Sequence, residues 1–114
     1  MPFVNVKVSS PMAVEQKDEL SRAITKAICE ILKKPVGSVM VGIEADYDLW
    51  LGDEKPERCA FVSVEHKGAG SIVQYNALTE KICEALEVGP GVPSESVYVN
   101  FKMVNDWGRG GRIT

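Results

Sequence analysis

The sequence predicts an α/β fold made of two β-α-β repeats, with a four-stranded sheet that carries two helices on one face. Three observations lead to this prediction: an internal repeat, four segments of alternating apolar and polar residues, and two segments with apolar residues at intervals of three and four. The 114 residues have the length of one domain that can bury a hydrophobic core, so we expect a single domain over residues 1–114.

The two halves of the chain resemble each other. Phe3-Val-Asn-Val matches Phe61-Val-Ser-Val at an offset of 58 (3 to 61), and Ser38-Val-Met-Val matches Ser96-Val-Tyr-Val at the same offset (38 to 96). Between these, Ala27-Ile-Cys-Glu-Ile-Leu matches Lys81-Ile-Cys-Glu-Ala-Leu at an offset of 54 (27 to 81). Chance resemblance between valine-rich strands is the alternative, but three ordered matches favour a true repeat.

Alternation predicts strands over residues 2–8, 38–44, 59–66 and 96–103, and helical spacing predicts helices over 13–33 and 70–87. A strand–helix–strand unit makes a right-handed crossover between parallel strands, so both helices should cover the valine-rich face of the sheet. The opposite face is then bare and mixed in polarity. Three subunits could turn such faces inward and pair opposite charges, and the alternative is a solvated sheet face.

Composition excludes several classes of protein. The net charge of −3 disfavours a nucleic-acid partner, because phosphate binding requires a basic surface. No apolar run reaches the roughly 20 residues of a membrane helix, so no membrane partner is expected. We expect no secretory signal peptide, and we expect the three cysteines to be reduced thiols in a cytoplasmic protein. Secretion would require a route that does not depend on a signal peptide.

Four short segments resemble one family. They are Met1-Pro2 directly before a strand, Lys34-Pro35 after the first helix, Val39-Met40-Val41, and Val97-Tyr98-Val99-Asn100. In their order and spacing they resemble the macrophage migration inhibitory factor and D-dopachrome tautomerase family, from Pro2 to about Met103. The resemblance implies the tautomerase fold, a homotrimer whose three sheets surround a central channel, and active sites at the subunit interfaces.

The same resemblance implies a set of site residues. Pro2 would be the catalytic base once Met1 is removed, and Lys34 would bind the carboxylate of the substrate. The neighbouring subunit would contribute Tyr98 and Asn100. Lys67 would lie on a loop whose backbone meets the substrate, and Trp107 would line the pocket.

The chemistry suits these residue types. Keto–enol tautomerisation needs a neutral base at working pH and a group that stabilises charge on the carbonyl oxygen. A free α-amine has a pKa of about 7.7–8.0, and burial or neighbouring lysines would lower the pKa of a Pro2 amine further. A second-position proline is also common without any catalytic role. Lys34 could equally be a cation that only stabilises the end of the helix, and the adjacent Lys33 could bind the carboxylate in its place.

Departures from the family pattern concern the substrate more than the fold. Cys59 stands alone where better-known members carry a Cys-x-x-Cys pair, so no thiol–disulfide activity is expected. Residues 105–114 replace the usual ending: Arg109 and Arg112 could bind an acidic substrate, but the glycine-rich flanks favour a mobile tail. The single histidine, His66, is interpreted as a strand-end residue. We expect no metal and no cofactor.

The leading hypothesis is a cofactor-free tautomerase acting on a small α-keto acid such as phenylpyruvate, or on a dopachrome-type aromatic substrate. A second is a cytokine-like protein that binds a cell-surface receptor and retains only vestigial catalysis. A third is a non-catalytic small-ligand-binding domain, in which Pro2 has no chemical role.

Overall fold

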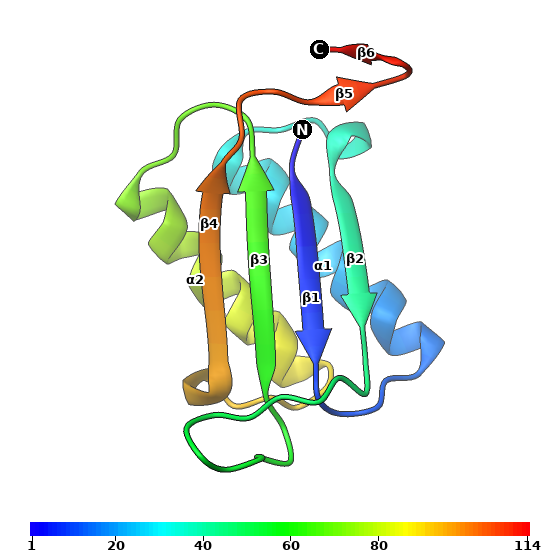
Figure 1. Ribbon diagram of the computed structural model, residues 1–114, viewed down its shortest axis with the longest axis vertical. Coiled ribbons are helices and arrows are strands. Elements are labelled where there is room, and N and C mark those ends of the chain that lie inside the picture. The colour runs from blue at the N-terminus through cyan, green and yellow to red at the C-terminus, as the bar shows by residue number, and fades with distance from the viewer.

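The alternating segments of both halves form the four strands of one sheet (Figure 1). In the computed structural model, which describes residues 1–114, these strands are β1 (Phe3–Val8), β2 (Met40–Glu44), β3 (Ala60–His66) and β4 (Val97–Met103). Three of the predicted strands are confirmed to within one residue. β2 begins later than predicted, because Val36–Ser38 forms a turn of 3₁₀ helix before it.

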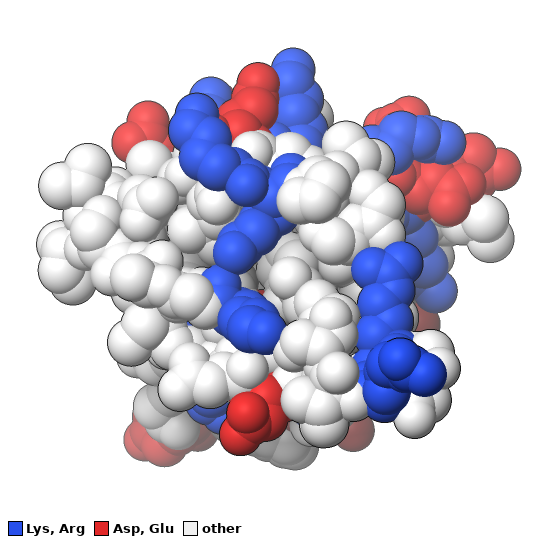
Figure 2. Space-filling view, turned by 90° about the horizontal axis from the view of Figure 1, so that it is seen from above, with Lys and Arg blue, Asp and Glu red and all other residues white.

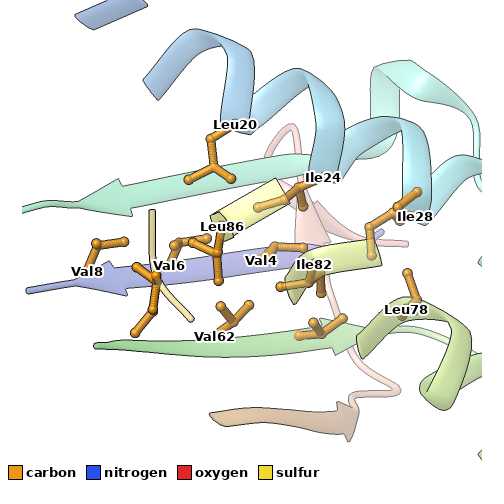
Figure 3. Packing of buried hydrophobic residues seen from close by; sticks show 14 of the residues in the cluster. Val4, Val6, Val8, Leu20, Ile24, Ile28, Val62, Leu78, Ile82 and Leu86 are labelled. Atoms are coloured by element: carbon orange, nitrogen blue, oxygen red, sulfur yellow. The ribbon is translucent and has the colours of Figure 1, made fainter. Parts of the chain in front are cut away.

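Two helices, α1 (Val14–Leu32) and α2 (Ile72–Val88), pack side by side against one face of the sheet. Figure 3 shows residues of both helices pointing at the valines of β1 and β3. The buried helical residues are Leu20, Ile24, Ala27, Ile28 and Leu32 on α1 and Leu78, Ile82 and Leu86 on α2. The core therefore lies between the helices and the valine-rich face, as predicted. Neither helix is both long and apolar enough to cross a membrane.

The two halves of the chain meet along β1 and β3. The strand order is β2-β1-β3-β4, in which β1–β2 and β3–β4 are parallel pairs and the central pair β1–β3 is antiparallel. Asn5 lies opposite Ser63, and these two residues occupy equivalent positions of the repeat, 58 apart (5 to 63). An approximate two-fold axis therefore passes through this pair and relates the two β-α-β halves.

The turns that lead into β2 and β4 repeat the same backbone geometry. Each is a short 3₁₀ helix, Val36–Ser38 in the first half and Ser94–Ser96 in the second. Each is preceded by a proline: Pro35 has φ −68° and ψ 144°, and Pro93 has φ −66° and ψ 144°. Matching backbone angles at matching positions confirm the internal repeat.

The second face of the sheet carries no helix and faces the viewer in Figure 1. The strand register arranges its residues in three rows, each running from β2 to β4. The rows are Met40, Phe3, Glu65 and Lys102; Gly42, Asn5, Ser63 and Asn100; and Glu44, Lys7, Phe61 and Tyr98. This face is mixed in polarity, as predicted.

The glycine-rich tail has a defined backbone arrangement in residues 108–114. Strands β5 (Gly108–Arg109) and β6 (Arg112–Ile113) form a hairpin, which lies above the sheet in Figure 1. Its turn residues, Gly110 and Gly111, have φ of +62° and +90°, which a type I′ turn requires and glycine adopts without strain. The Thr114 amide also donates to the Trp107 carbonyl at 2.9 Å. The glycines therefore close a turn between two arginines.

A buried histidine and a half-buried tyrosine form a polar pair at the end of β3. His66 is fully buried, and its Nε2 lies 2.7 Å from the hydroxyl of Tyr75 on α2. The Tyr75 ring stacks on Phe101 of β4, with 4.3 Å between centroids. Gly70 passes directly beside Tyr75, and a Cβ atom built on Gly70 would overlap the tyrosine hydroxyl. A residue without a side chain is thus needed at Gly70 for Tyr75 to reach His66.

We predict that Gly70→Ala destabilises the protein by about 1–3 kcal/mol, because the new methyl group must displace the Tyr75 ring from its place between His66 and Phe101. The matched control is Gly37→Ala, since nothing lies within 4 Å of a Cβ at Gly37. Urea unfolding of both variants measures the difference. Equal stability of the two variants would contradict this account.

Candidate functional site

A pocket of about 210 Å³ lies at the end of the sheet where β1 begins. It is formed by the N-terminal residues, the turn before β2 and the start of the tail hairpin. Its lining residues are Met1, Pro2, Phe3, Gly37, Ser38, Val39, Met40, Trp107, Gly108 and Arg109. Two of the predicted site residues, Pro2 and Trp107, therefore line one pocket.

Pro2 is held at the entrance to β1. It is buried, and its carbonyl accepts a hydrogen bond from the Met40 amide at 3.0 Å, so β2 continues the pairing up to Pro2. With Met1 in place, the nitrogen of Pro2 is an amide. Removal of Met1 would convert it to a secondary amine on the wall of the pocket.

The structure distinguishes the two lysines that end α1. Lys33 caps the helix in the left-handed conformation, with φ 58° and ψ 48°, and is exposed. This turn directs the chain back toward the sheet. Lys34 is half-buried, and its Nζ donates to the Lys67 carbonyl at 2.9 Å. Lys34, and not Lys33, therefore faces the end of β3.

Lys67 follows β3 directly and contributes both its backbone and its side chain. The Lys67 carbonyl accepts the Lys34 hydrogen bond, while the Lys67 Nζ donates to the Thr114 carbonyl at 2.7 Å. The end of β3 is thereby connected to α1 on one side and to the tail hairpin on the other.

Trp107 is half-buried and turns its indole toward the chain that leads into the hairpin. Its Nε1 donates to the Val104 carbonyl at 2.7 Å, a bond that holds the ring against the pocket.

Tyr98 and Asn100 lie far from Pro2 within the same chain. Continuing the β1–β3–β4 register by one residue places Pro2 opposite His66 and Met103, so Tyr98 is five residues along and two strands across from Pro2. At about 3.3 Å per residue and 4.8 Å per strand, this separation is roughly 19 Å, and for Asn100 roughly 14 Å. Tyr98 is 62% exposed, and the side-chain oxygen Oδ1 of Asn100 is buried without a hydrogen-bond partner. One chain alone does not bring these two residues to the pocket.

Positive charge gathers around the N-terminus. The pKa of the Met1 amine is below its ordinary value, with burial as the largest cause. The positive charges of Lys34, Lys67 and Arg109 lower it further, in that order. Because like charges disfavour the protonated amine, this end of the molecule favours a neutral amine.

His66 is a feature that the sequence interpretation missed. It is a strand-end residue as expected, but it also lies on the inner face beneath the pocket, fully buried. Burial is the largest cause of the lowered pKa of His66. A hydrogen bond with the Lys67 backbone opposes this lowering, and the smaller effects of the Lys34 charge and the N-terminal charge add to it. The sequence did contain a signal for its burial: in the alternation of β3, His66 lies on the same face as Val62 and Val64, which point into the core.

A larger hollow of about 700 Å³ lies at the opposite end of the sheet, near Arg58, Glu87 and Glu95. No hydrophobic residue lines it, and none of the predicted site residues reaches it. It therefore lacks the apolar walls that bind the carbon skeleton of a small organic ligand. No three His, Cys, Asp or Glu residues are close enough together to hold a metal ion.

Comparisons with known proteins agree with this architecture. The family model described as macrophage migration inhibitory factor matches residues 1–112. MIF2 of Leishmania major has a TM-score of 0.93 at 25% sequence identity, and the match covers 100% of this chain and 97% of that one. No curated protein sequence matches the chain.

Two further solved structures, both below 25% identity, support the fold alone. The macrophage migration inhibitory factor-like protein of Entamoeba histolytica has a TM-score of 0.89 at 20% identity, covering 99% of this chain and 98% of that one. A "Q0 fused 4-OT wild type symmetric trimer" has a TM-score of 0.84 at 20% identity, covering 96% of this chain and 93% of that one. The predicted two-layer fold with its doubled β-α-β order is confirmed.

We predict that His66 makes stability depend on pH. Because the pKa of His66 is lower in the folded state, the unfolded chain binds a proton first as the pH falls below about 6.5, and stability is lost there. The slope contributed by one such group is at most about 1.4 kcal/mol per pH unit. Urea unfolding at pH 7.5 and 5.5 should show a smaller loss for His66→Gln than for the unmodified protein. Equal losses would show that His66 titrates alike in both states.

Proposed function

The chain belongs to the macrophage migration inhibitory factor family of the tautomerase superfamily, and from this premise we propose that it is a cofactor-independent keto–enol tautomerase. Its base is Pro2, exposed as a secondary amine by removal of Met1, and its substrates are α-keto acids of the phenylpyruvate type or dopachrome-type aromatics. The observation that carries the proposal is a terminal amine in a pocket that Arg109 also lines, with Lys34 and Lys67 near enough to lower the pKa of that amine.

The electrostatics support a neutral base. The amine of Met1 already has a lowered pKa, although Met1 is only partly buried. Removal of Met1 moves the amine to Pro2, which is buried, so the desolvation that disfavours its charged form increases. A neutral amine near pH 7 is what proton abstraction from carbon requires.

The reaction moves one proton between two atoms of the substrate. The Pro2 nitrogen takes the proton from the carbon beside the carbonyl, and the electron pair of the broken C–H bond forms the enolate. The Pro2 ammonium then returns the proton to the enolate oxygen. Lys34 binds the substrate carboxylate, and the surrounding positive charge stabilises the enolate as it develops.

A homotrimer completes this proposed site. The separation from Pro2 within one chain, roughly 19 Å for Tyr98 and roughly 14 Å for Asn100, favours a site to which a neighbouring subunit contributes these two residues. The bare sheet face and the unpartnered Asn100 side chain support such an interface. One of the similar structures is a symmetric trimer.

We predict that phenylpyruvate tautomerase activity requires Pro2 with a free nitrogen. Protein shown by mass spectrometry to begin at Pro2 should be active, and kcat/KM should rise with pH to a plateau, with a midpoint below about 7.7. Pro2→Gly should lose at least about tenfold in kcat/KM, because the ring that orients the lone pair is gone. Protein that retains Met1 is the control and should show only the buffer rate. Full activity of that control would refute the proposed base.

We predict that mixing Tyr98→Ala subunits with Pro2→Gly subunits restores part of the tautomerase activity that each variant has lost. In a trimer with shared sites, a Tyr98→Ala subunit supplies Pro2 and a Pro2→Gly subunit supplies Tyr98. Co-refolding equal amounts should therefore rebuild roughly a quarter of the sites. Each variant refolded alone gives the baseline, and sedimentation confirms the trimer. Activity that stays at the baseline in mixed trimers would mean that Tyr98 acts elsewhere.

A further inference from the structure

We propose that folding closes the Met1–Pro2 peptide bond to aminopeptidases. The state of the N-terminus is then decided while the chain is unfolded, and it stays fixed once β1 has joined the sheet. The folded protein exists in two forms that do not interconvert, one that begins at Met1 and one that begins at Pro2. This protection does not depend on the tautomerase proposal. Its effect on activity does rest on that proposal, because only the second form has a basic nitrogen at Pro2.

The residue that follows the cleaved bond is part of the sheet. Pro2 is buried, and the Met40 amide donates a hydrogen bond to its carbonyl at 3.0 Å. From Phe3 onward, β1 pairs with β2 on one side and with β3 on the other. An aminopeptidase binds the terminal amine and the following residues inside its active site, so Pro2 has to leave the sheet before the Met1–Pro2 bond can be cut.

The start of β1 is costly to release. Chain ends open readily where they have few buried contacts, but Val4, the second residue of β1, is fully buried in the core. β1 is also an inner strand in the order β2-β1-β3-β4, so release of its first residues disrupts two ladders. When opening and closing are fast compared with cleavage, the rate of cleavage follows the population of the open form. A small open population therefore protects the bond.

Met1 itself lies in the pocket. It is partly buried between the turn before β2 and the start of the tail hairpin, and in Figure 1 the N-terminus lies below that hairpin. Lys34, Lys67 and Arg109 lie near enough to lower the pKa of the Met1 amine. Figure 2 views the molecule from this end and shows lysine and arginine atoms across the middle of the face. An enzyme that approaches the amine from this end meets the hairpin and these long side chains.

The test follows the loss of Met1 by intact-mass spectrometry in the presence of a methionine aminopeptidase. Protein that retains Met1 is prepared with the aminopeptidase of the expression host inhibited. The folded protein should lose Met1 at least about a hundredfold more slowly than a peptide of residues 1–12, which has the same cleavage site without the fold. The matched control is the same protein with Gly-Ser-Gly-Ser inserted between Met1 and Pro2, which should lose its methionine at nearly the rate of the corresponding peptide.

Two valine substitutions test the role of β1. Val4→Ala removes buried methyl groups at the start of the strand, so it should raise the rate of Met1 loss from the folded protein at least about tenfold. The matched control is Val73→Ala on α2, where the side chain is 79% exposed, and its rate should equal that of the unmodified protein. Circular dichroism shows whether each variant is folded in the assay. A Val4→Ala chain that does not fold should lose Met1 at the rate of the peptide.

Loss of Met1 from the folded protein at the rate of the peptide would overturn the inference, and so would equal rates for Val4→Ala and Val73→Ala. Slow loss from the protein with the insertion would also overturn it, because the barrier would then lie outside the pocket and β1. Tautomerase activity is measured separately. Protein confirmed by mass to begin at Pro2 but inactive towards phenylpyruvate would refute the proposed function and leave the protection of the Met1–Pro2 bond standing.

Discussion

The six residue pairs between β1 and β3, from Phe3–Glu65 to Val8–Ala60, join the two β-α-β halves into one sheet, and helices α1 and α2 pack together across the same boundary. Register in this pairing decides which residues meet at each end of the sheet, because a slip of one residue would turn every valine of one strand to the bare face. In the observed register the start of β1 adjoins the end of β3. Pro2 therefore lies beside His66 and Lys67, and the turn after α1 brings Lys34 to the same place. The antiparallel contact therefore sets which residues meet at the N-terminal end of the sheet, where the turn before β2 and the tail hairpin complete the pocket.

The approximate two-fold symmetry of the halves explains why only one end of the sheet carries this pocket. At the offset of 58, Pro2 corresponds to Ala60, His66 to Val8 and Lys34 to Val92. The second end thus repeats the backbone with apolar residues in place of the proposed base Pro2, the imidazole of His66 and the cation of Lys34, and these three apolar residues are buried in the core. A duplicated scaffold supplies stability at both ends, and the departures from symmetry concentrate at one end. This pattern is expected when function requires buried polar groups that the core would otherwise exclude.

The strands, the helices and the bare sheet face were predictable because each follows from a periodicity that extends over many residues. The choice between Lys33 and Lys34 was not, since it depends on the left-handed backbone of Lys33. The contact between His66 and Tyr75 was also beyond reach, because it joins a strand end to a helix through a packing detail at Gly70. The tail hairpin is too short for periodicity, and its Gly110–Gly111 pair was the one signal of a turn. Pro2, Lys34, Lys67 and Trp107 lie at one end of the sheet, which is consistent with the family resemblance, whereas Tyr98 and Asn100 lie away from that end in the same chain.

The tail hairpin is attached to the rest of the molecule by few bonds, including those from Thr114 to Trp107 and to Lys67. Its residues 108–114 are all exposed, and none belongs to the hydrophobic core. Changes in this segment are therefore nearly free of the constraints that packing imposes on the strands and helices. Exchange of Arg109 and Arg112 for other residues would change the charge at this end of the molecule, while the folding of the domain stays as it is. The hairpin can therefore change its charge and shape without a change in the packing of the domain.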